Sequence, residues 1–475
     1  MLDKKNISLL GLILGIIVFL FFNITSPPEG LDKISWLTAG VAILMTIWWV
    51  TEAIPIYATG LVPLLLFPLL DLFDLKVVAA SYAHPLVLLF LGGFIIASAM
   101  EDSGLHKRIA LKILSFSGTS PSKIIAGFMF TTAALSMWVS NTASTIMMLP
   151  IATSVIAFFT SQNNVNNKDF AIPLLLSIAY AASIGGTATL IGTPTNIMLA
   201  SILSDTYGYK ISFIDWLIIG LPVVTILIPI VWLFLTRIIF KVSAEKSDAL
   251  ENTLLKMKRE IGKPSATEKV VAFIFFLTAT LWIFRKTLND KFNLTLNDTS
   301  IGILGALLLF IIPYGSNKRA CSWETANKIP WGVLFLVGGG IALSRAIKVS
   351  GLAEWIGSFS NYLYGLDIYL LIFILFSKAI STAAIAASSP LFPYFPPLRL
   401  IACSRLSSVK TEKITGISNK IFKSLIPFVT ALDIKSKCFV SPLIKLPIAI
   451  IESGLFLFAI LHPNINSKLP LTFIL

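Results

Sequence analysis

Residues 140–145 read Ser-Asn-Thr-Ala-Ser-Thr, five small polar residues in six, and they interrupt an apolar segment that runs from Ile124 to Phe159. At the depth of a lipid bilayer such residues are unfavourable unless they face protein, water or a ligand. Their hydroxyl and carboxamide oxygens suit a small hard cation, whereas N–H groups freed at a helix start suit an anion. Close helix packing by small residues is the alternative explanation.

The composition around this stretch is that of a membrane protein. The chain has 475 residues, of which 56% are hydrophobic and 13% charged, and many apolar runs approach the roughly 20 residues that span a bilayer. The first run, 7–22, lacks a small-residue cleavage site, so we predict a retained first helix rather than a signal peptide. The three cysteines form no spaced pair and no metal pattern. We predict an all-α polytopic membrane protein.

Two apolar arms of about 17 residues each flank the polar stretch within residues 122–160, and each is short for a full span. This length predicts a re-entrant hairpin with the polar residues at its tip. The preceding span, 85–100, is followed by His106-Lys107-Arg108, which places that end in the cytoplasm. We expect a multi-pass protein of the cell (inner) membrane, with a cytoplasmic N-terminus.

A second interruption lies in the apolar segment 170–203, where residues 185–196 read GGTATLIGTPTN. Proline removes a backbone hydrogen bond and glycine frees the backbone to turn. We predict a discontinuous helix that meets the hairpin tip; a proline kink without a ligand is the alternative. Neither interruption contains Lys or Arg, so an anion would be bound by N–H groups, hydroxyls, helix ends and a bound cation.

An internal repeat organises the chain. Leu89-Phe90-Leu91-Gly92-Gly93 through Ser103-Gly104-Leu105 returns, about 246 residues later, as Leu334-Phe335-Leu336-Val337-Gly338-Gly339 through Ser350-Gly351-Leu352. By the count of crossings the two copies run in opposite directions, as in inverted-repeat secondary transporters. We divide the chain into scaffold helices and the first span of repeat one (1–115), the hairpin, broken helix and return helix (116–240), a cytoplasmic linker (241–269), the start of the second repeat (270–377) and a basic C-terminal segment (378–475).

At this point the chain resembles the divalent anion–sodium symporter family, which carries dicarboxylates, tricarboxylates or sulfate. The resemblance covers about residues 8–375. It rests on three motifs in order, namely Trp48-Trp49-Val50-Thr51-Glu52-Ala53-Ile54-Pro55, Ser140-Asn141-Thr142-Ala143 followed by Leu149-Pro150, and Gly185-Gly186-Thr187 to Gly192-Thr193-Pro194-Thr195-Asn196. Each motif alone is modest, but the order, the spacings and the repeat make them specific.

The resemblance implies a homodimer whose protomers each have a scaffold domain and a mobile transport domain. It implies a sodium site formed by Ser136, Ser140, Asn141 and Gly192. It also implies that a substrate carboxylate meets Asn141, Thr142, Thr193 and Pro194. The apolar residues after Thr142 resemble the sodium-coupled members rather than the exchangers. Sodium is the expected coupling ion, with no other cofactor and no nucleic-acid partner.

The match fails after about residue 378. The repeat predicts a second Ser-Asn-Thr near Ala387, but residues 381–390 read STAAIAASSP and contain no asparagine. The last 98 residues carry eleven Lys or Arg against three Asp or Glu, where two spans and a hairpin are expected. A reading-frame shift near 378, a diverged C-terminal domain and a slip in the repeat alignment are three explanations. Thr195 also stands where the family usually has a second proline.

We therefore expect sodium-coupled symport of di- or tricarboxylate anions. The alternative is a non-transporting product of a disrupted symporter gene, with only the first half of the binding site intact. An intramembrane enzyme would need a nucleophile–base pair or a metal cluster within the spans, and the sequence offers only the isolated Glu52 and His84. We expect no enzyme activity. A channel suits broken helices and inverted repeats less well than alternating access.

Overall fold

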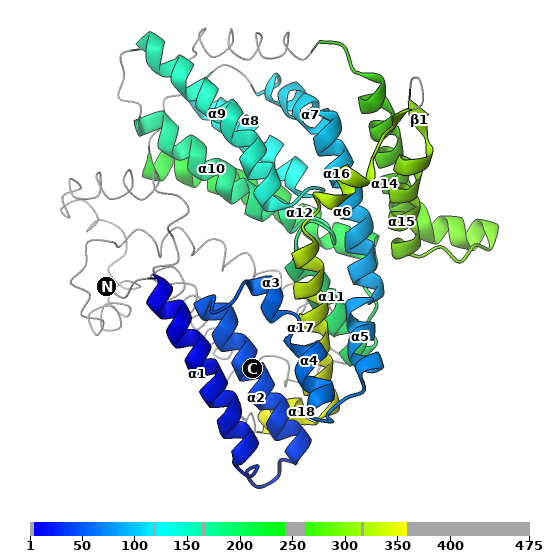
Figure 1. The fold of residues 1–475 in the computed structure, drawn as a ribbon. Helices are drawn as coiled ribbons and strands as arrows, with labels where there is room; N and C mark the ends of the chain where they lie inside the picture. Colours follow the sequence, from blue (N-terminus) through cyan, green and yellow to red (C-terminus); the bar gives the residue numbers. More distant parts are fainter. Residues whose placement is uncertain are drawn as a thin grey trace, which may run out of the picture. The chain divides into compact units, whose positions relative to one another are not determined.

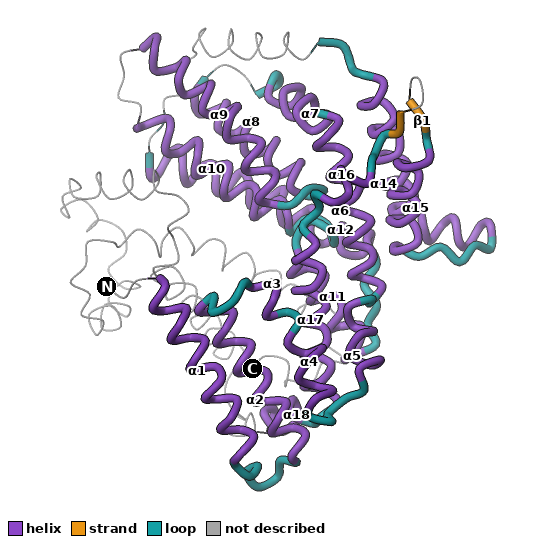
Figure 2. Tube along the Cα trace, viewed as in Figure 1, coloured by secondary structure: helices purple, strands orange, loops and turns teal. Residues whose placement is uncertain are grey.

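The structure is a computed structural model, and it describes residues 4–117, 120–163, 168–240, 242, 262–314 and 318–358. These residues all belong to one compact unit of the chain. They are almost entirely helical (Figures 1 and 2). The expectations for residues 378–475, including the missing second Ser-Asn-Thr, lie outside the described residues.

The first half of the chain holds the scaffold helices, the predicted hairpin and the predicted broken helix. Its elements are α1 (Lys4–Ile24), α2 (Lys33–Thr51), α3 (Ile56–Thr59), α4 (Val62–Leu69), α5 (Leu75–Tyr82), α6 (Pro85–Ser103), α7 (Leu105–Leu114), α8 (Pro121–Ser136), α9 (Asn141–Asn163), α10 (Lys168–Gly186), α11 (Pro194–Tyr207), α12 (Phe213–Leu233) and the π-helix η1 (Phe234–Ile239).

The second half contributes fewer described elements. They are α14 (Ala266–Phe292), α15 (Asp298–Ile311), the antiparallel pair β1 (Pro313–Tyr314) and β2 (Lys318–Arg319), α16 (Trp323–Asn327), α17 (Trp331–Val349) and α18 (Leu352–Ser358). The short β-pair and α16 lie between α15 and α17 in the chain. Helix α14 begins at Ala266 rather than near 270, because Ser265 and Glu268 form a capping box there.

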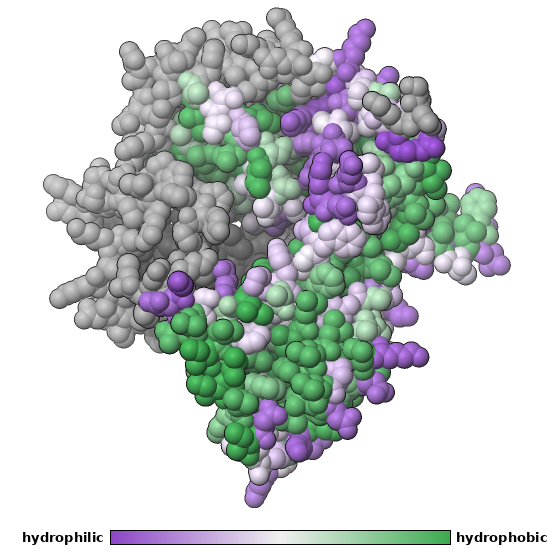
Figure 3. All heavy atoms as spheres, viewed as in Figure 1, coloured by the Kyte–Doolittle hydropathy of each residue, from purple (hydrophilic) through white to green (hydrophobic). Residues whose placement is uncertain are grey.

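Within the described residues, six helical segments are long and apolar enough to cross a membrane. They are Lys5–Ile24, Lys33–Thr51, Leu75–Ser103, Phe213–Ile239, Ala266–Phe292 and Trp331–Val349. Helix α1 presents Ile13, Leu14, Ile17 and Phe21 on its exposed side, and green apolar atoms cover this region in Figure 3. Large apolar surface of this kind suits lipid contact. The chain is an all-α polytopic membrane protein.

Helices α6 and α17, which carry the two copies of the repeat, run antiparallel. Near the end of α6, Ser98 Oγ donates to Thr325 O at 3.0 Å. Lys328, just before α17, places its Nζ 3.1 Å from Asp102 Oδ1. At the other end, the Lys348 ammonium donates to the carbonyl of Asp205. The Asp205 carboxylate lies 3.6 Å from His84, which caps the start of α6. The repeated sequences therefore lie in opposite directions.

The largest part of the hydrophobic core lies where α6 meets α14 and α15, and it includes Leu89, Phe90, Ile274 and Trp282. At one crossing the backbones of Gly92 and Gly302 approach so closely that a side chain would not fit. Helix α7 is fixed to the start of α14, because Arg108 Nε lies 2.7 Å from Glu268 Oε2 and the same guanidinium donates to two carbonyls of residues 262–263. The core thus joins the first half of the chain to the second.

Candidate functional site

The predicted hairpin is formed by α8 and α9, which pack against each other and against α10. The four residues between the two helices, 137–140, make the turn. Ser140 ends it as a helix cap, since its Oγ accepts the N–H of Ala143 at 3.3 Å and its carbonyl accepts the N–H of Ser144 at 2.9 Å. Asn141 and Thr142 therefore lie in the first turn of α9, where N–H groups lack helical partners.

Ser136 and Asn141 meet inside the hairpin. Ser136 is fully buried, and its Oγ lies 2.8 Å from Asn141 Oδ1 and 2.7 Å from Ala182 O of α10. The single hydroxyl hydrogen of Ser136 is shared between these two acceptors, so neither oxygen receives a full hydrogen bond from it. Three oxygens are thus gathered in one place with few donors, which is an arrangement that a small hard cation would relieve.

The predicted break separates α10 from α11 over residues 187–193, which are mostly buried. Asn196, in the first turn of α11, holds the break closed: its Nδ2 donates to Gly186 O at 3.0 Å and to Thr189 O at 2.7 Å. Its side chain is 4% exposed. These bonds satisfy carbonyls that the interrupted helix leaves without partners.

The hairpin turn and the helix break are in direct contact. Thr189 Oγ1 donates to Met137 O in the turn. A Cβ built on Gly186 would overlap the Asn141 carboxamide, and one built on Gly192 would overlap the Gly186 carbonyl. Glycine is required at both positions because backbone and side-chain oxygens occupy the space that a methyl group would take.

The structure therefore brings Ser136, Asn141 and, through Gly186, Gly192 into one cluster, with Ser140 at the adjoining helix cap. Thr142 is exposed, whereas Thr193 and Pro194 are half-buried. Among the described residues no hydrogen bond joins any of these three side chains across the two breaks. Thr193 Oγ1 lies 3.5 Å from Thr195 Oγ1 at the start of α11. The residues predicted to meet a carboxylate thus stand at two helix starts, Asn141 and Thr142 at that of α9 and Thr193 and Pro194 at that of α11.

The chemistry open to this arrangement follows from its groups. Helices α9 and α11 both begin here, and a helix start favours an anion through its free N–H groups and the positive end of the helix dipole. Beside them lie the gathered oxygens of Ser136, Asn141 and Ala182. A cation and a carboxylate could be held together here without any Lys or Arg in the two breaks.

Several residues that shape the site were not assigned from the sequence. Thr189 and Asn196 lie within the quoted break, but nothing in their spacing shows which carbonyls they bind. Trp138 of the hairpin turn packs against Phe213, and Trp216 Nε1 donates to Thr187 O at 3.0 Å. These tryptophans carry no local signal, because their partners lie far along the chain.

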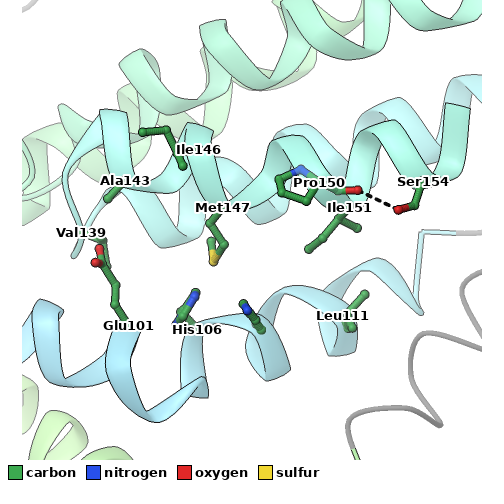
Figure 4. A pocket seen from close by; sticks show the side chains of 11 residues that line it. Glu101, His106, Leu111, Val139, Ala143, Ile146, Met147, Pro150, Ile151 and Ser154 are labelled. Atoms are coloured by element: carbon green, nitrogen blue, oxygen red, sulfur yellow. Dashed lines mark hydrogen bonds between the residues drawn. The ribbon is translucent and has the colours of Figure 1, made fainter.

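A separate cavity of about 730 Å³ lies between the end of α6, α7 and the outer face of α9. Figure 4 shows Glu101 and His106 on one wall and apolar side chains such as Met147 and Ile151 on the other. Ser154 Oγ donates to Pro150 O at 2.9 Å at one end. None of the predicted binding residues lines this cavity, although Val139 and Ala143 flank the hairpin turn, so it is not the candidate site.

Comparison with known proteins places the chain in a defined group. Residues 46–393 match the citrate transporter family, CitMHS. The chain is 42% identical over 383 residues to the sodium-dependent dicarboxylate transporter SdcS of Staphylococcus aureus strain USA300, covering 78% of this chain and 74% of the relative. It is 41% identical, with the same coverage, to the SdcS protein of strain NCTC 8325.

Proposed function

Because the chain belongs to the citrate transporter family, we propose that it is a secondary active transporter that couples sodium to the movement of di- or tricarboxylate anions across the membrane. The observation that carries the proposal is the contact between the hairpin turn and the helix break, at which oxygens gather beside two helix starts. The transporter relatives favour this function over a non-transporting remnant and over an enzyme.

The assignment of roles rests on this geometry. Sodium would bind at Ser136, Ser140, Asn141 and Gly192, where oxygens are buried and donors are few. The carboxylate would meet Asn141 and Thr142 at the start of α9 and Thr193 and Pro194 at the start of α11. Coupling follows from electrostatics: a dianion inside the membrane is strongly unfavourable. A bound cation lowers this cost, so the empty site does not take the substrate alone.

The orientation and assembly are part of the same proposal. We place the protein in the cell (inner) membrane with its N-terminus in the cytoplasm. The basic residues that follow α6 mark a cytoplasmic end, and the N-terminus lies on the same side when the short apolar segment Ile56–Leu69 crosses the membrane together with the three longer segments that end at Ser103. By likeness to the family, it would be a homodimer. Cross-linking in native membranes, read out as a band of twice the chain mass, tests the assembly.

The direct test is uptake of labelled succinate and citrate by proteoliposomes that contain the full 475-residue chain. We expect uptake that requires an inward sodium gradient, is not supported by potassium, and is inhibited by unlabelled dicarboxylate. Absence of sodium-dependent uptake with correctly inserted protein would contradict the proposed function and favour the disrupted product. This experiment also tests the chain with its atypical basic C-terminal segment in place.

A further inference from the structure

The two breaks need external support, because neither residues 137–140 nor residues 187–193 are held by a continuous helix. Helix bonds fix each residue to its neighbour four positions away, and such bonds become sparse where the helix is interrupted. In the hairpin turn Met137 and Val139 still donate to carbonyls four residues back, whereas in the second break Thr187, Ala188 and Gly192 donate to carbonyls only three residues back. The first turns of α12 lie against both breaks. This element has no part in the proposed binding of sodium or carboxylate.

Trp216 holds the second break. It is 6% exposed, and its Nε1 donates to the Thr187 carbonyl at 3.0 Å. Thr187 is the first residue after α10, so its carbonyl lies where the helix bonds stop. One turn further along α12, Gly220 packs so closely on the carbonyls of Thr187 and Ala188 that a Cβ would lie 2.7 Å from each. The face of α12 that carries Trp216 and Gly220 is thus seated on the backbone of the break.

Phe213, less than one turn before Trp216, holds the hairpin turn. Its ring stacks on Trp138 with centroids 6.0 Å apart and planes at 27°. The Phe213 ring also stacks on Trp282 of α14, with centroids 4.6 Å apart and planes at 19°. Phe275 meets Trp138 edge-on at 4.9 Å. Aromatic pairs in these geometries give stability beyond the area they bury, and Trp138 is only two residues from Ser140.

The first turn of α12 is itself fixed before it reaches either break. Ser212 and Asp215 form a capping box. Asp298, at the start of α15, accepts the Phe213 N–H at 2.8 Å, and Arg285 Nε lies 3.3 Å from the same carboxylate. The element that touches the breaks is therefore anchored to α14 and α15.

From these contacts we infer that the first turn of α12 is the positioning element of the site, with Trp216 as the residue that fixes the helix break beside the cation oxygens. The inference rests on the proposed function. Removing the indole N–H leaves the Thr187 carbonyl without a donor and loosens residues 187–193, which include Gly192. Sodium affinity falls, because the site must then be ordered by the ion itself. Translocation does not use this bond, so the maximal rate is kept.

The test uses two matched variants on one helix. W216F keeps an aromatic ring and removes the N–H. W232F removes the same group from Trp232, whose Nε1 donates at 2.8 Å to Ser122 O at the start of α8, remote from the breaks. In proteoliposomes we expect W216F to raise the half-saturating sodium concentration by about tenfold, with a maximal uptake rate within about twofold of wild type. W232F is expected to change neither by more than about twofold.

Equal sodium dependence in W216F and W232F, with wild type active, would overturn the inference and leave the proposed function standing. A loss of rate alone, without a change in the sodium requirement, would also overturn it. If wild type shows no sodium-driven uptake, the inference is tested by comparing the melting temperature of the purified protein in sodium with that in potassium. A sodium-specific rise that W216F weakens and W232F keeps supports the inference, and no such rise in wild type overturns it together with the proposed function.

Discussion

The side chains of Ser136 and Asn141 meet across the turn between α8 and α9, with Oγ and Oδ1 2.8 Å apart. One residue ends the first arm of the hairpin and the other begins the second. The contact therefore closes the turn and, together with Ala182 O, forms the oxygen cluster proposed to hold sodium.

Replacing Asn141 by alanine removes the carboxamide from this cluster, and we expect sodium-dependent uptake to be abolished. S136A removes one of the oxygens and is expected to raise the half-saturating sodium concentration by about tenfold. The control is S154A, since Ser154 bonds only within its own helix turn. Unchanged sodium-dependent uptake in N141A would refute the assignment of the site.

A methyl group at Gly186 would occupy the space of the Asn141 carboxamide, so G186A is expected to displace Asn141 and to eliminate sodium-dependent uptake. The matched control is G340A: a Cβ there would lie 2.6 Å from the terminal methyl of Met198, the far end of a flexible side chain outside residues 187–193, which can move aside. Uptake by reconstituted protein at equal insertion measures both. If G186A transports as well as G340A, the close contact between break and hairpin is not needed for binding.

Asn196 supplies two hydrogen-bond donors to carbonyls of the break, and aspartate in its place would turn a carboxylate toward those oxygens. We expect N196D to lose uptake, because buried like-charged oxygens without a donor are unfavourable. N196Q keeps the carboxamide donors on a side chain that is longer by one methylene group, and it is expected to retain part of the activity. Comparable activity of N196D and wild type would show that the break is held by other contacts.

The ion pair between Arg108 and Glu268 is largely buried, with side chains 21% and 10% exposed, whereas Lys328 and Asp102 are 66% and 49% exposed. R108A leaves the Glu268 carboxylate without its main partner, and we expect a loss of about 2 kcal/mol in stability. K328A is expected to cost under about 1 kcal/mol. Thermal unfolding in detergent measures the difference, and equal melting temperatures for the two variants would contradict it.

Stability is expected to decrease in mild acid because of His106. Burial lowers the pKa of this imidazole below its usual range, against the opposing effect of the hydrogen bond between Nδ1 and Met100 O at 2.8 Å. The unfolded chain, with a histidine pKa of about 6.5, then binds more protons than the folded chain. The stability that neutral, buried His106 contributes is fully present above about pH 6.5, and it declines as the pH falls toward the lower pKa of the folded state. Between pH 5 and 8 the melting temperature of H106Q should change less with pH than that of wild type. An unchanged pH dependence would exclude His106 as the cause.

The positions of the two interruptions could be predicted from local chemistry. Residues 140–145 and 185–196 contain the residues that leave a helix without regular bonds, and the structure has a hairpin turn and a break at these places. Helix α7 was not assigned, because the basic residues His106-Lys107-Arg108 suggested only a membrane boundary. The roles of Trp138 and Trp216 could not be predicted, since each depends on a partner that only the folded chain brings near. The start of α14 can be predicted from the sequence, because Ser265 followed by Glu268 three residues later is the pattern of a capping box.

The antiparallel pairing of α6 with α17, and the packing of α14 and α15 on α6, join the two halves of the described chain by non-covalent contacts. Its two halves meet through buried helix faces, the Arg108–Glu268 pair and the Asp298 anchor of α12. We therefore regard the described part of the chain as two complementary fragments, one before and one after residues 241–261, and we expect the two polypeptides to associate when they are produced together.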